Sequence, residues 1–227
     1  MVRTSPLPMF ANPLTFVADG RESVLGKVLG LLGFAAAFTA VGAILGAAIG
    51  PVAILASIIG TLGSLLVLMF VKERAPFNLI LLYVFATFEG LALGVIISSY
   101  VASGFGQVVI DAGATTALIT LGAGMYGMST SRDLTSLGNI LRIALFTIVI
   151  ASIVGIFTQL PLFHLILSIV TAVIFTGFLI IDLNRLSKAR TLTNGDAIML
   201  TINVYLDIVN LFLALLRILR FFAARRR

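Results

Sequence analysis

Two long stretches of this chain contain no Asp, Glu, Lys or Arg, and they restrict the folds open to it. They cover residues 28–71 and 143–181. A helix rises about 1.5 Å per residue and needs about 20 apolar residues to cross the hydrocarbon core of a bilayer, so each stretch is long enough for two spans. Charged residues make up only 11% of the chain, against about a quarter in soluble proteins. We therefore predict an integral membrane protein.

Turn residues divide the apolar sequence into seven predicted helices, which makes the chain an all-α membrane protein. Gly50-Pro51 separates the first two helices, and residues 159–161 (Gln-Leu-Pro) separate the fifth from the sixth. The third, fourth and seventh spans are expected over 77–99, 108–130 and 197–219. The predicted organisation is a cytosolic N-terminal leader over 1–27, a seven-helix transmembrane domain over 28–219 and a basic C-terminal tail over 220–227.

Lys and Arg residues are present in the leader and in every second connection, 2–3, 4–5 and 6–7, and absent from the other three. The positive-inside rule therefore places the N-terminus in the cytosol. Seven crossings put the arginines of the tail outside, whereas a last segment that enters and returns would keep them inside. We favour seven crossings. Within the first span, Gly42 and Gly46 have the small-xxx-small spacing that predicts close helix packing.

Polar side chains interrupt the last span. Asn203, Asp207, Asn210 and Arg217 fall within about 80° of one another at about 100° per residue. Lipid does not solvate such a stripe, so we expect it to face protein or a water-filled cavity. The seventh helix is therefore predicted to be central, with the other six wrapped around it.

Two further acids, Asp182 and Glu89, lie within spans, and Asn78 shares a face with Glu89. A charge at the centre of a span costs about 2.5–3.5 kcal/mol, so each acid needs a partner or a function. A structural role would be pairing with a basic residue in or near a span, namely Arg142, Arg185 or Arg217.

Asp182 and Asp207 can approach each other because helices 6 and 7 are antiparallel neighbours. Their depths differ by roughly 8 Å, which a later start or a tilt of helix 7 would remove. Two carboxylates in contact do not both ionise cheaply and share one proton. Such a pair suits a pH switch or a cation site, and calcium is the cation best served by carboxylates, carbonyls and water.

Four segments resemble the transmembrane Bax-inhibitor-motif family. They are LYVFATFEGLALG (82–94), RDLTSLGNIL (132–141), IIDLNRL (180–186) and VYLDIVNLFLALLRIL (204–219). The last is the most specific, and the resemblance covers nearly all of the chain after the leader. The compact length is similar to that of bacterial members, which implies the bacterial inner membrane.

The resemblance implies six helices around a central seventh and a pH-sensitive calcium leak controlled by two aspartates, which match Asp182 and Asp207. It also implies that a basic residue at the end of helix 2 pairs with the helix-6 aspartate in the closed pore. Lys72 or Arg74 must take this role as gating latch, and Lys72 falls at the aligned place. Calcium would bind transiently at the aspartates, with no resident cofactor and no enzymatic activity. Intramembrane polar support would come from Glu89, Asn78, Asn203, Asn210 and Arg217.

The strongest alternative is a membrane interaction protein that regulates a partner, such as a membrane protease, without conducting ions. The protein is not expected to be an intramembrane aspartyl protease itself, because Asp207 lacks the Gly-x-Gly-Asp turn of such enzymes. With no cysteine and one histidine, the chain does not favour a transition-metal carrier. Its basic residues mark segment ends and form no nucleic-acid-binding patch. The expected partners are the lipid bilayer, calcium, protons and a membrane protein.

Overall fold

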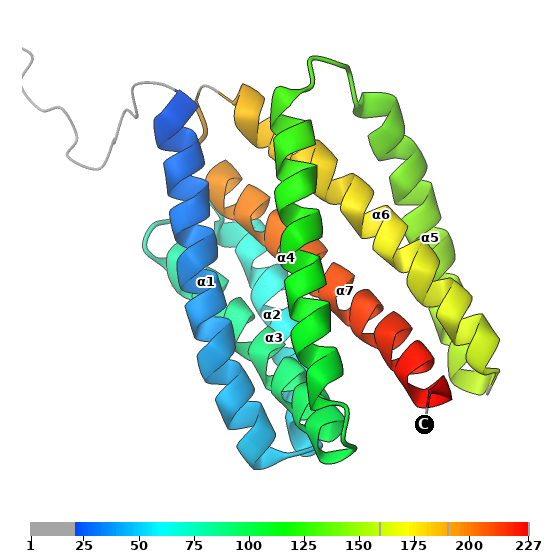
Figure 1. The fold of residues 1–227 in the computed structure, drawn as a ribbon. Coiled ribbons are helices and arrows are strands. Elements are labelled where there is room, and N and C mark those ends of the chain that lie inside the picture. The colour runs from blue at the N-terminus through cyan, green and yellow to red at the C-terminus, as the bar shows by residue number, and fades with distance from the viewer. Residues whose placement is uncertain (1–20, 159, 190, 227) are drawn as a thin grey trace, which may run out of the picture.

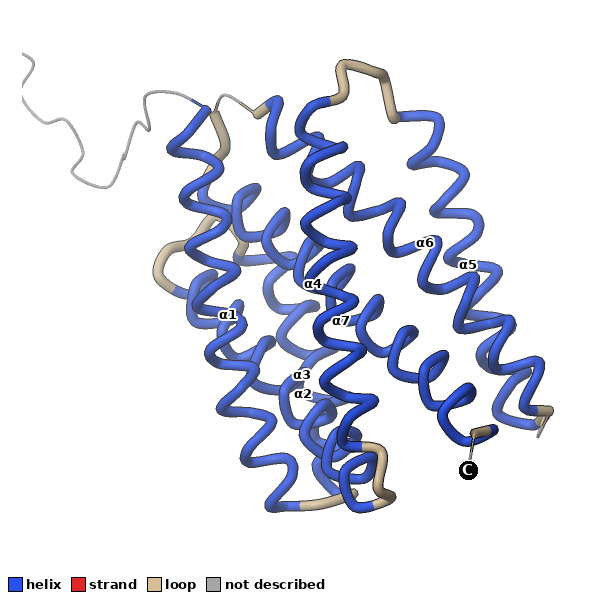
Figure 2. The backbone as a smooth tube through the Cα atoms, in the orientation of Figure 1, coloured by secondary structure: helices blue, strands red, loops and turns tan. Residues whose placement is uncertain are grey.

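The computed structural model describes residues 21–158, 160–189 and 191–226, so most of the predicted leader lies outside the described residues. Regular structure within this part is entirely helical (Figures 1 and 2). The helices are α1 (Arg21–Ile49), α2 (Val52–Val71), α3 (Phe77–Ala102), α4 (Gly106–Ser129), α5 (Thr135–Phe157), α6 (Pro161–Lys188) and α7 (Asn194–Arg225). Each contains a span long and apolar enough to cross a membrane, which confirms the predicted fold class.

Several helices extend beyond the apolar stretches from which they were predicted. α1 begins at Arg21, α5 begins at Thr135, and α7 continues to Arg225 through most of the expected tail. A polar side chain does not by itself interrupt the backbone hydrogen bonds of a helix. Lys and Arg at a helix end can reach water with their long side chains. The loss of apolar character therefore marks the membrane boundary without ending the helix.

The predicted turns separate the helices where expected. Gly50 has φ +80°, a left-handed conformation that glycine adopts without a Cβ clash, and α2 follows directly after Pro51. Pro161 begins α6, where its missing N–H leaves no helical hydrogen bond unmade.

α7 is the central helix. Within its apolar window 61% of residues are buried, whereas no other span exceeds 39%. It packs directly against α1, α3, α4 and α6. The two remaining helices form an outer layer, with α2 resting on α3 and α5 resting on α6. The predicted central position of the last span is therefore confirmed, with four helices in the inner shell and two outside it.

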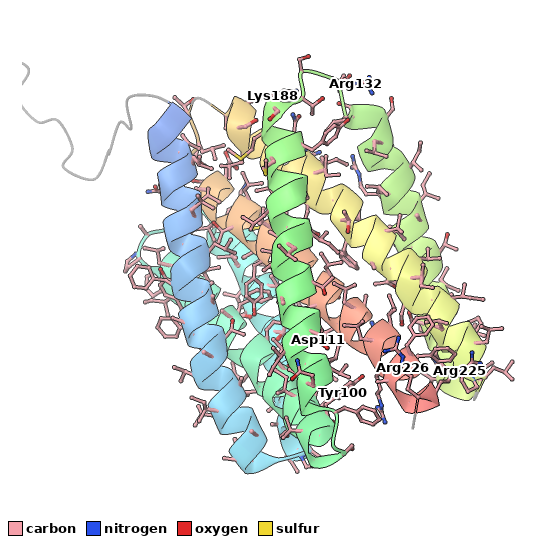
Figure 3. All side chains as sticks on the ribbon, viewed as in Figure 1. Tyr100, Asp111, Arg132, Lys188, Arg225 and Arg226 are labelled. Carbon is pink, nitrogen blue, oxygen red and sulfur yellow. The ribbon has the colours of Figure 1, made fainter. Side chains whose placement is uncertain are left out.

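The bundle has two ends. We call the end that holds the start of α1 and the α2–α3, α4–α5 and α6–α7 connections the amino end, and the opposite end the carboxy end. α7 crosses the whole bundle and finishes at the carboxy end, close to the labelled Arg225 and Arg226 (Figures 1 and 3). The alternative in which the last segment enters and returns is therefore wrong. Near this end the Arg220 guanidinium lies 5.0 Å from the Tyr100 ring centroid and 5.5 Å from that of Phe105.

Glycines bring α1 and α3 into backbone contact. A Cβ added at Gly42 would overlap the carbonyl oxygen of Thr87, and one at Gly46 would overlap that of Leu91. From the other side, Gly90 and Gly94 of α3 lie directly against the α1 backbone. This confirms the close packing predicted from the small-xxx-small spacing, and α3 supplies a matching pair of glycines.

Candidate functional site

The two predicted aspartates come together between α6 and α7. Asp182 and Asp207 are both buried, and they lie close enough for their charges to interact. In Figure 1 the first turn of α7 (orange) lies below the last turn of α6 (gold), because the connection runs back along the bundle before α7 starts. α7 begins at Asn194, before the predicted residue 197, so the later start that would have removed the expected depth difference is wrong.

Asp182 has a local cationic partner. Its Oδ1 accepts a hydrogen bond from Nη1 of Arg185 at 3.3 Å, one turn further along α6. The Asp182 side chain is 7% exposed, whereas that of Arg185 is 57% exposed. The guanidinium therefore links the buried carboxylate to the surface at the amino end, and the predicted local pair is confirmed.

Asp207 differs, because no basic side chain among the described residues forms an ion pair with it. Among the described residues, no donor forms a hydrogen bond with its buried Oδ2. Val204 and Leu211, one turn away on the same face of α7, belong to an apolar cluster that includes Leu179 and Leu183 of α6. A buried polar atom without a partner is costly and calls for an explanation such as a functional role.

The predicted gating latch has a different partner in this structure. Nζ of Lys72 lies 3.7 Å from Oδ1 of Asp196 in the first turn of α7, with both side chains about half exposed. Asp182 pairs with Arg185, so the structure does not join Lys72 to the helix-6 aspartate. Arg74 is exposed on the same connection and forms hydrogen bonds through its backbone.

Glu73 holds the α2–α3 connection to the start of α7. Its Oε1 accepts a hydrogen bond from the Thr193 hydroxyl at 3.0 Å, and its Oε2 accepts one from the Gly195 amide at 3.4 Å. We call the contacts made by Lys72 and Glu73 with residues 193–196 the clasp. A carboxylate beside the first amides of a helix is also favoured by the helix dipole. Glu73 was not predicted from the sequence, where this connection stands out only as a source of positive charge.

Asn78 and Glu89, the two polar residues predicted on α3, serve different contacts. Asn78 is 1% exposed, and its Nδ2 donates to the Lys72 carbonyl oxygen at 2.7 Å, which fixes the connection that carries the clasp. Glu89 is half-buried and lies near Tyr205 of α7, close enough for its charge to influence that residue. The Tyr205 hydroxyl lies 2.8 Å from the Thr39 hydroxyl and so joins α7 to α1.

The polar stripe on α7 is only partly buried. Asp207 is buried and Asn210 is half-buried, but Asn203 and Arg217 are exposed on the bundle. The stripe was expected to face the interior along its whole width, and this is true only of the edge that carries Asp207. The stripe is about 80° wide, so its Asp207 edge turns toward α6 while the Asn203 and Arg217 side remains uncovered.

Asn184 is a second residue that the sequence analysis did not single out. It is 5% exposed, and its Nδ2 donates to the carbonyl oxygens of Gly127 at 2.7 Å and Thr130 at 3.0 Å. These are among the final carbonyls of α4, which have no helical donor. Asn184 therefore fixes the α6 segment that carries Asp182. Its position in the IIDLNRL segment, two residues after the aspartate, was the available clue.

The described residues contain no cluster of three or more His, Cys, Asp and Glu side chains suited to a metal ion. The acid pair therefore provides two carboxylates and no third acidic ligand from this part of the chain. A hard cation takes six to eight oxygens, so most of its shell here would be carbonyls or water.

The fold and the buried acid pair define a seven-span integral membrane protein built around its last helix. The family described as "Inhibitor of apoptosis-promoting Bax1" matches residues 21–224. The chain belongs to this Bax inhibitor family, which confirms the resemblance noted from its motifs.

Named relatives come from bacteria and a virus. The "Golgi anti-apoptotic protein" of vaccinia virus (strain Lister) is 36% identical over 169 residues, covering 74% of this chain and 69% of that protein. An uncharacterized membrane protein of Vibrio cholerae is 32% identical over 201 residues, covering 87% and 89%. The "Modulator of FtsH protease YccA" of Escherichia coli (strain K12) is 30% identical over 165 residues, covering 73% and 74%.

Proposed function

We propose that this protein is a pH-sensitive calcium leak channel gated by Asp182 and Asp207. The observation that supports this most directly is the difference between the two buried acids: Arg185 neutralises Asp182, whereas Oδ2 of Asp207 lacks a donor among the described residues. A shared proton would supply the donor that Asp207 lacks. A protonated and a deprotonated carboxyl group then form one short hydrogen bond.

Loss of this proton would open the channel. At low pH the proton joins the two carboxyl groups and holds α6 against α7. At higher pH it leaves, and two negative charges face each other in a region of low dielectric constant, where repulsion is strong. Arg185 neutralises only part of this charge. The aspartates then separate, and flux increases as pH rises.

The clasp is the second part of the gate. Lys72 and Glu73 join the α2–α3 connection to the first turn of α7, so a separation of α6 and α7 pulls on these contacts. Release of the clasp frees α2, which belongs to the outer layer, to move away and open a path from the amino end. Calcium then passes by way of Asp207 and Asp182.

The bacterial relatives and the charge pattern support a location and an orientation for the protein. We place the protein in a bacterial inner membrane, in line with its bacterial relatives, with the amino end facing the cytosol. The arginines at the end of α7 then lie on the opposite side. Cysteine-accessibility labelling at Arg74 and at Ala224 would test this arrangement, because the two positions should react from opposite sides.

Calcium flux into liposomes that contain only the purified protein, measured from pH 6 to pH 8, tests the channel function directly. We expect flux that increases with pH. Folded protein that carries no calcium at any pH in this range would contradict the proposal.

Regulation of a membrane protein partner is the second candidate function. It is favoured by the exposed Asn203 and Arg217, because polar side chains on a span avoid lipid and hydrogen-bond to polar groups of neighbouring helices. A relative is named as a modulator of the FtsH protease. A regulator would show no flux alone, and Asn203→Leu would weaken co-purification of its partner while leaving the isolated protein folded.

A further inference from the structure

A polar pocket lies at the amino end, apart from the aspartate pair. Its volume is about 370 Å³, within the range of small-ligand sites. It lies between the first turn of α5 and the last two turns of α6. The lining residues are Asp133, Leu134, Thr135, Ile181, Asn184, Arg185, Lys188 and Ala189.

Two cations on one face of α6 line this pocket. Arg185 and Lys188 are three residues apart and both are exposed. Nζ of Lys188 donates to the Arg132 carbonyl oxygen at 3.2 Å, which holds the ammonium group beside the α4–α5 connection, where Figure 3 labels both residues. Asn184 fixes the same α6 segment to α4. The α6 segment that carries both cations is therefore attached to α4 and to the α4–α5 connection.

Asp133 is the one acid among the lining residues, and its charge is already engaged. Its Oδ1 accepts a hydrogen bond from the Thr135 amide at 2.9 Å. Hydrogen bonds from Thr135, followed by the charge of Lys188, lower the pKa of Asp133. Counted as formal charges, Arg185, Lys188 and Asp133 give the lining a net positive charge of one unit, and Arg185 is also paired with Asp182, which lies outside the lining.

We propose that this pocket binds the phosphate of an anionic phospholipid headgroup. The pocket lies where α5 begins and α6 ends, and the ends of membrane spans are where lipid headgroups are expected. An arginine offers a fork of N–H donors that matches phosphate, and a lysine adds a point charge. Basic pockets between spans are known sites for anionic headgroups. Leu137 and Ile140, exposed on α5 just beyond the pocket, provide an apolar surface for the acyl chains.

Arg185 belongs both to this pocket and to the aspartate pair. Its guanidinium contacts Asp182, so a bound phosphate competes with the carboxylate for the same donors. If the proposed leak function is correct, an anionic lipid in the pocket withdraws positive charge from Asp182 and thereby changes the pH at which the pair separates. Lipid binding itself does not depend on ion conduction.

Native mass spectrometry of delipidated full-length protein tests the proposal, with dioleoyl phosphatidylglycerol compared with dioleoyl phosphatidylcholine. We expect preferential binding of phosphatidylglycerol, and a loss of about fivefold in affinity for each of Lys188→Gln and Arg185→Gln. Arg74→Gln, which removes an exposed charge at the same end, is the matched control and should retain full binding. Lys188→Arg should retain binding and so shows that charge, not a change in folding, is responsible.

Three results would overturn this proposal. Equal binding of the two lipids would remove the headgroup preference, and an equal loss in Arg74→Gln would show only general surface attraction. Displacement of phosphatidylglycerol by 1 mM inorganic phosphate would identify the occupant as free phosphate instead. This concentration is typical of free phosphate and on the order of the dissociation constant expected for a weak site with one or two charges. No ion gradient is present in these measurements, so a protein without calcium flux still gives a decisive answer.

Discussion

The contact between α1 and α3 and the contact between α6 and α7 are built on opposite principles. α1 and α3 meet through glycines, and their backbones touch at these positions. α6 and α7 also pack closely, but they enclose two carboxylates, one of which has an oxygen without a donor among the described residues. The first contact gains stability from van der Waals packing, while the second accepts an energetic penalty.

This difference separates the part of the bundle that maintains the fold from the part suited to change. In lipid, helix association depends on close packing more than on the hydrophobic effect, so the glycine contact is expected to be rigid. In the proposed gate, pH selects between a joined and a separated arrangement of the two acids. A substitution in either contact, or in an element that joins them, tests this difference.

The largest effect is expected from Gly46→Leu in the α1–α3 contact. A side chain there overlaps the Leu91 backbone, which does not move aside, so we expect a destabilisation of about 3 kcal/mol and little folded protein. Thermal unfolding in detergent measures this change. Gly30→Leu is the control, because a Cβ at Gly30 meets nothing within 4 Å. Equal stability of the two variants would refute the distinction.

Asp207→Asn tests the α6–α7 contact and should abolish the response of calcium flux to pH, since the amide cannot exchange the shared proton. Flux at pH 6 and at pH 8 is then expected to be equal. Asp111→Asn is the matched control, because this exposed acid on α4 pairs with Gln107 and lies away from the aspartates. Persistence of the pH response in Asp207→Asn would rule out the gating scheme.

Asn184→Leu tests how firmly α6 is attached behind the aspartate pair. The change leaves the carbonyls of Gly127 and Thr130 without their Asn184 donor, and we expect a loss of about 2 kcal/mol in stability. Asn139→Leu serves as the control, because Asn139 is exposed and accepts a hydrogen bond from Arg142 on its own helix. Thermal unfolding of the two variants provides the comparison.

Glu73→Gln weakens the clasp without changing the aspartates. The neutral amide binds the Gly195 amide less well, so the closed arrangement should lose about 0.5–1 kcal/mol, and flux at pH 6 should increase roughly threefold. Liposome flux at fixed pH is the measurement. Arg74→Gln, on the same connection but outside the clasp, should leave flux at the wild-type level.

Asp133→Ala is expected to have the smallest effect. Because the pKa of Asp133 is lowered by Thr135, this carboxylate is ionised throughout pH 6–8, and the stability that it contributes is present above its ordinary pKa. The melting temperature of the variant should therefore be slightly lower by the same amount at pH 6 and pH 8. The difference should disappear as pH falls through the lowered pKa, when the wild-type group becomes protonated.

The fold was largely accessible from sequence because a bilayer leaves few alternatives. Gly50-Pro51 and Pro161 marked turns, and the polar residues of the last span indicated its central place. The contacts of polar side chains were less predictable. Asn203 and Asp207 fall on one stripe by helical periodicity, yet one is exposed and the other buried, because periodicity gives a direction and not the neighbour that covers it. Lys72 was expected to pair with Asp182, and only the folded chain shows that it lies beside Asp196 instead.

α7 contains 32 residues in one unbroken helix, which makes it about 48 Å long, well beyond the roughly 30 Å of hydrocarbon that it crosses. The clasp holds one tip, and the stacking of Arg220 on Tyr100 and Phe105 secures the region near the other. Such a helix can tilt as a rigid rod about a point within the membrane. A tilt of about 5° around the middle moves each tip by about 2 Å in opposite directions. If the proposed gating is correct, proton loss at Asp207, near the middle of α7, would become a displacement at both membrane surfaces.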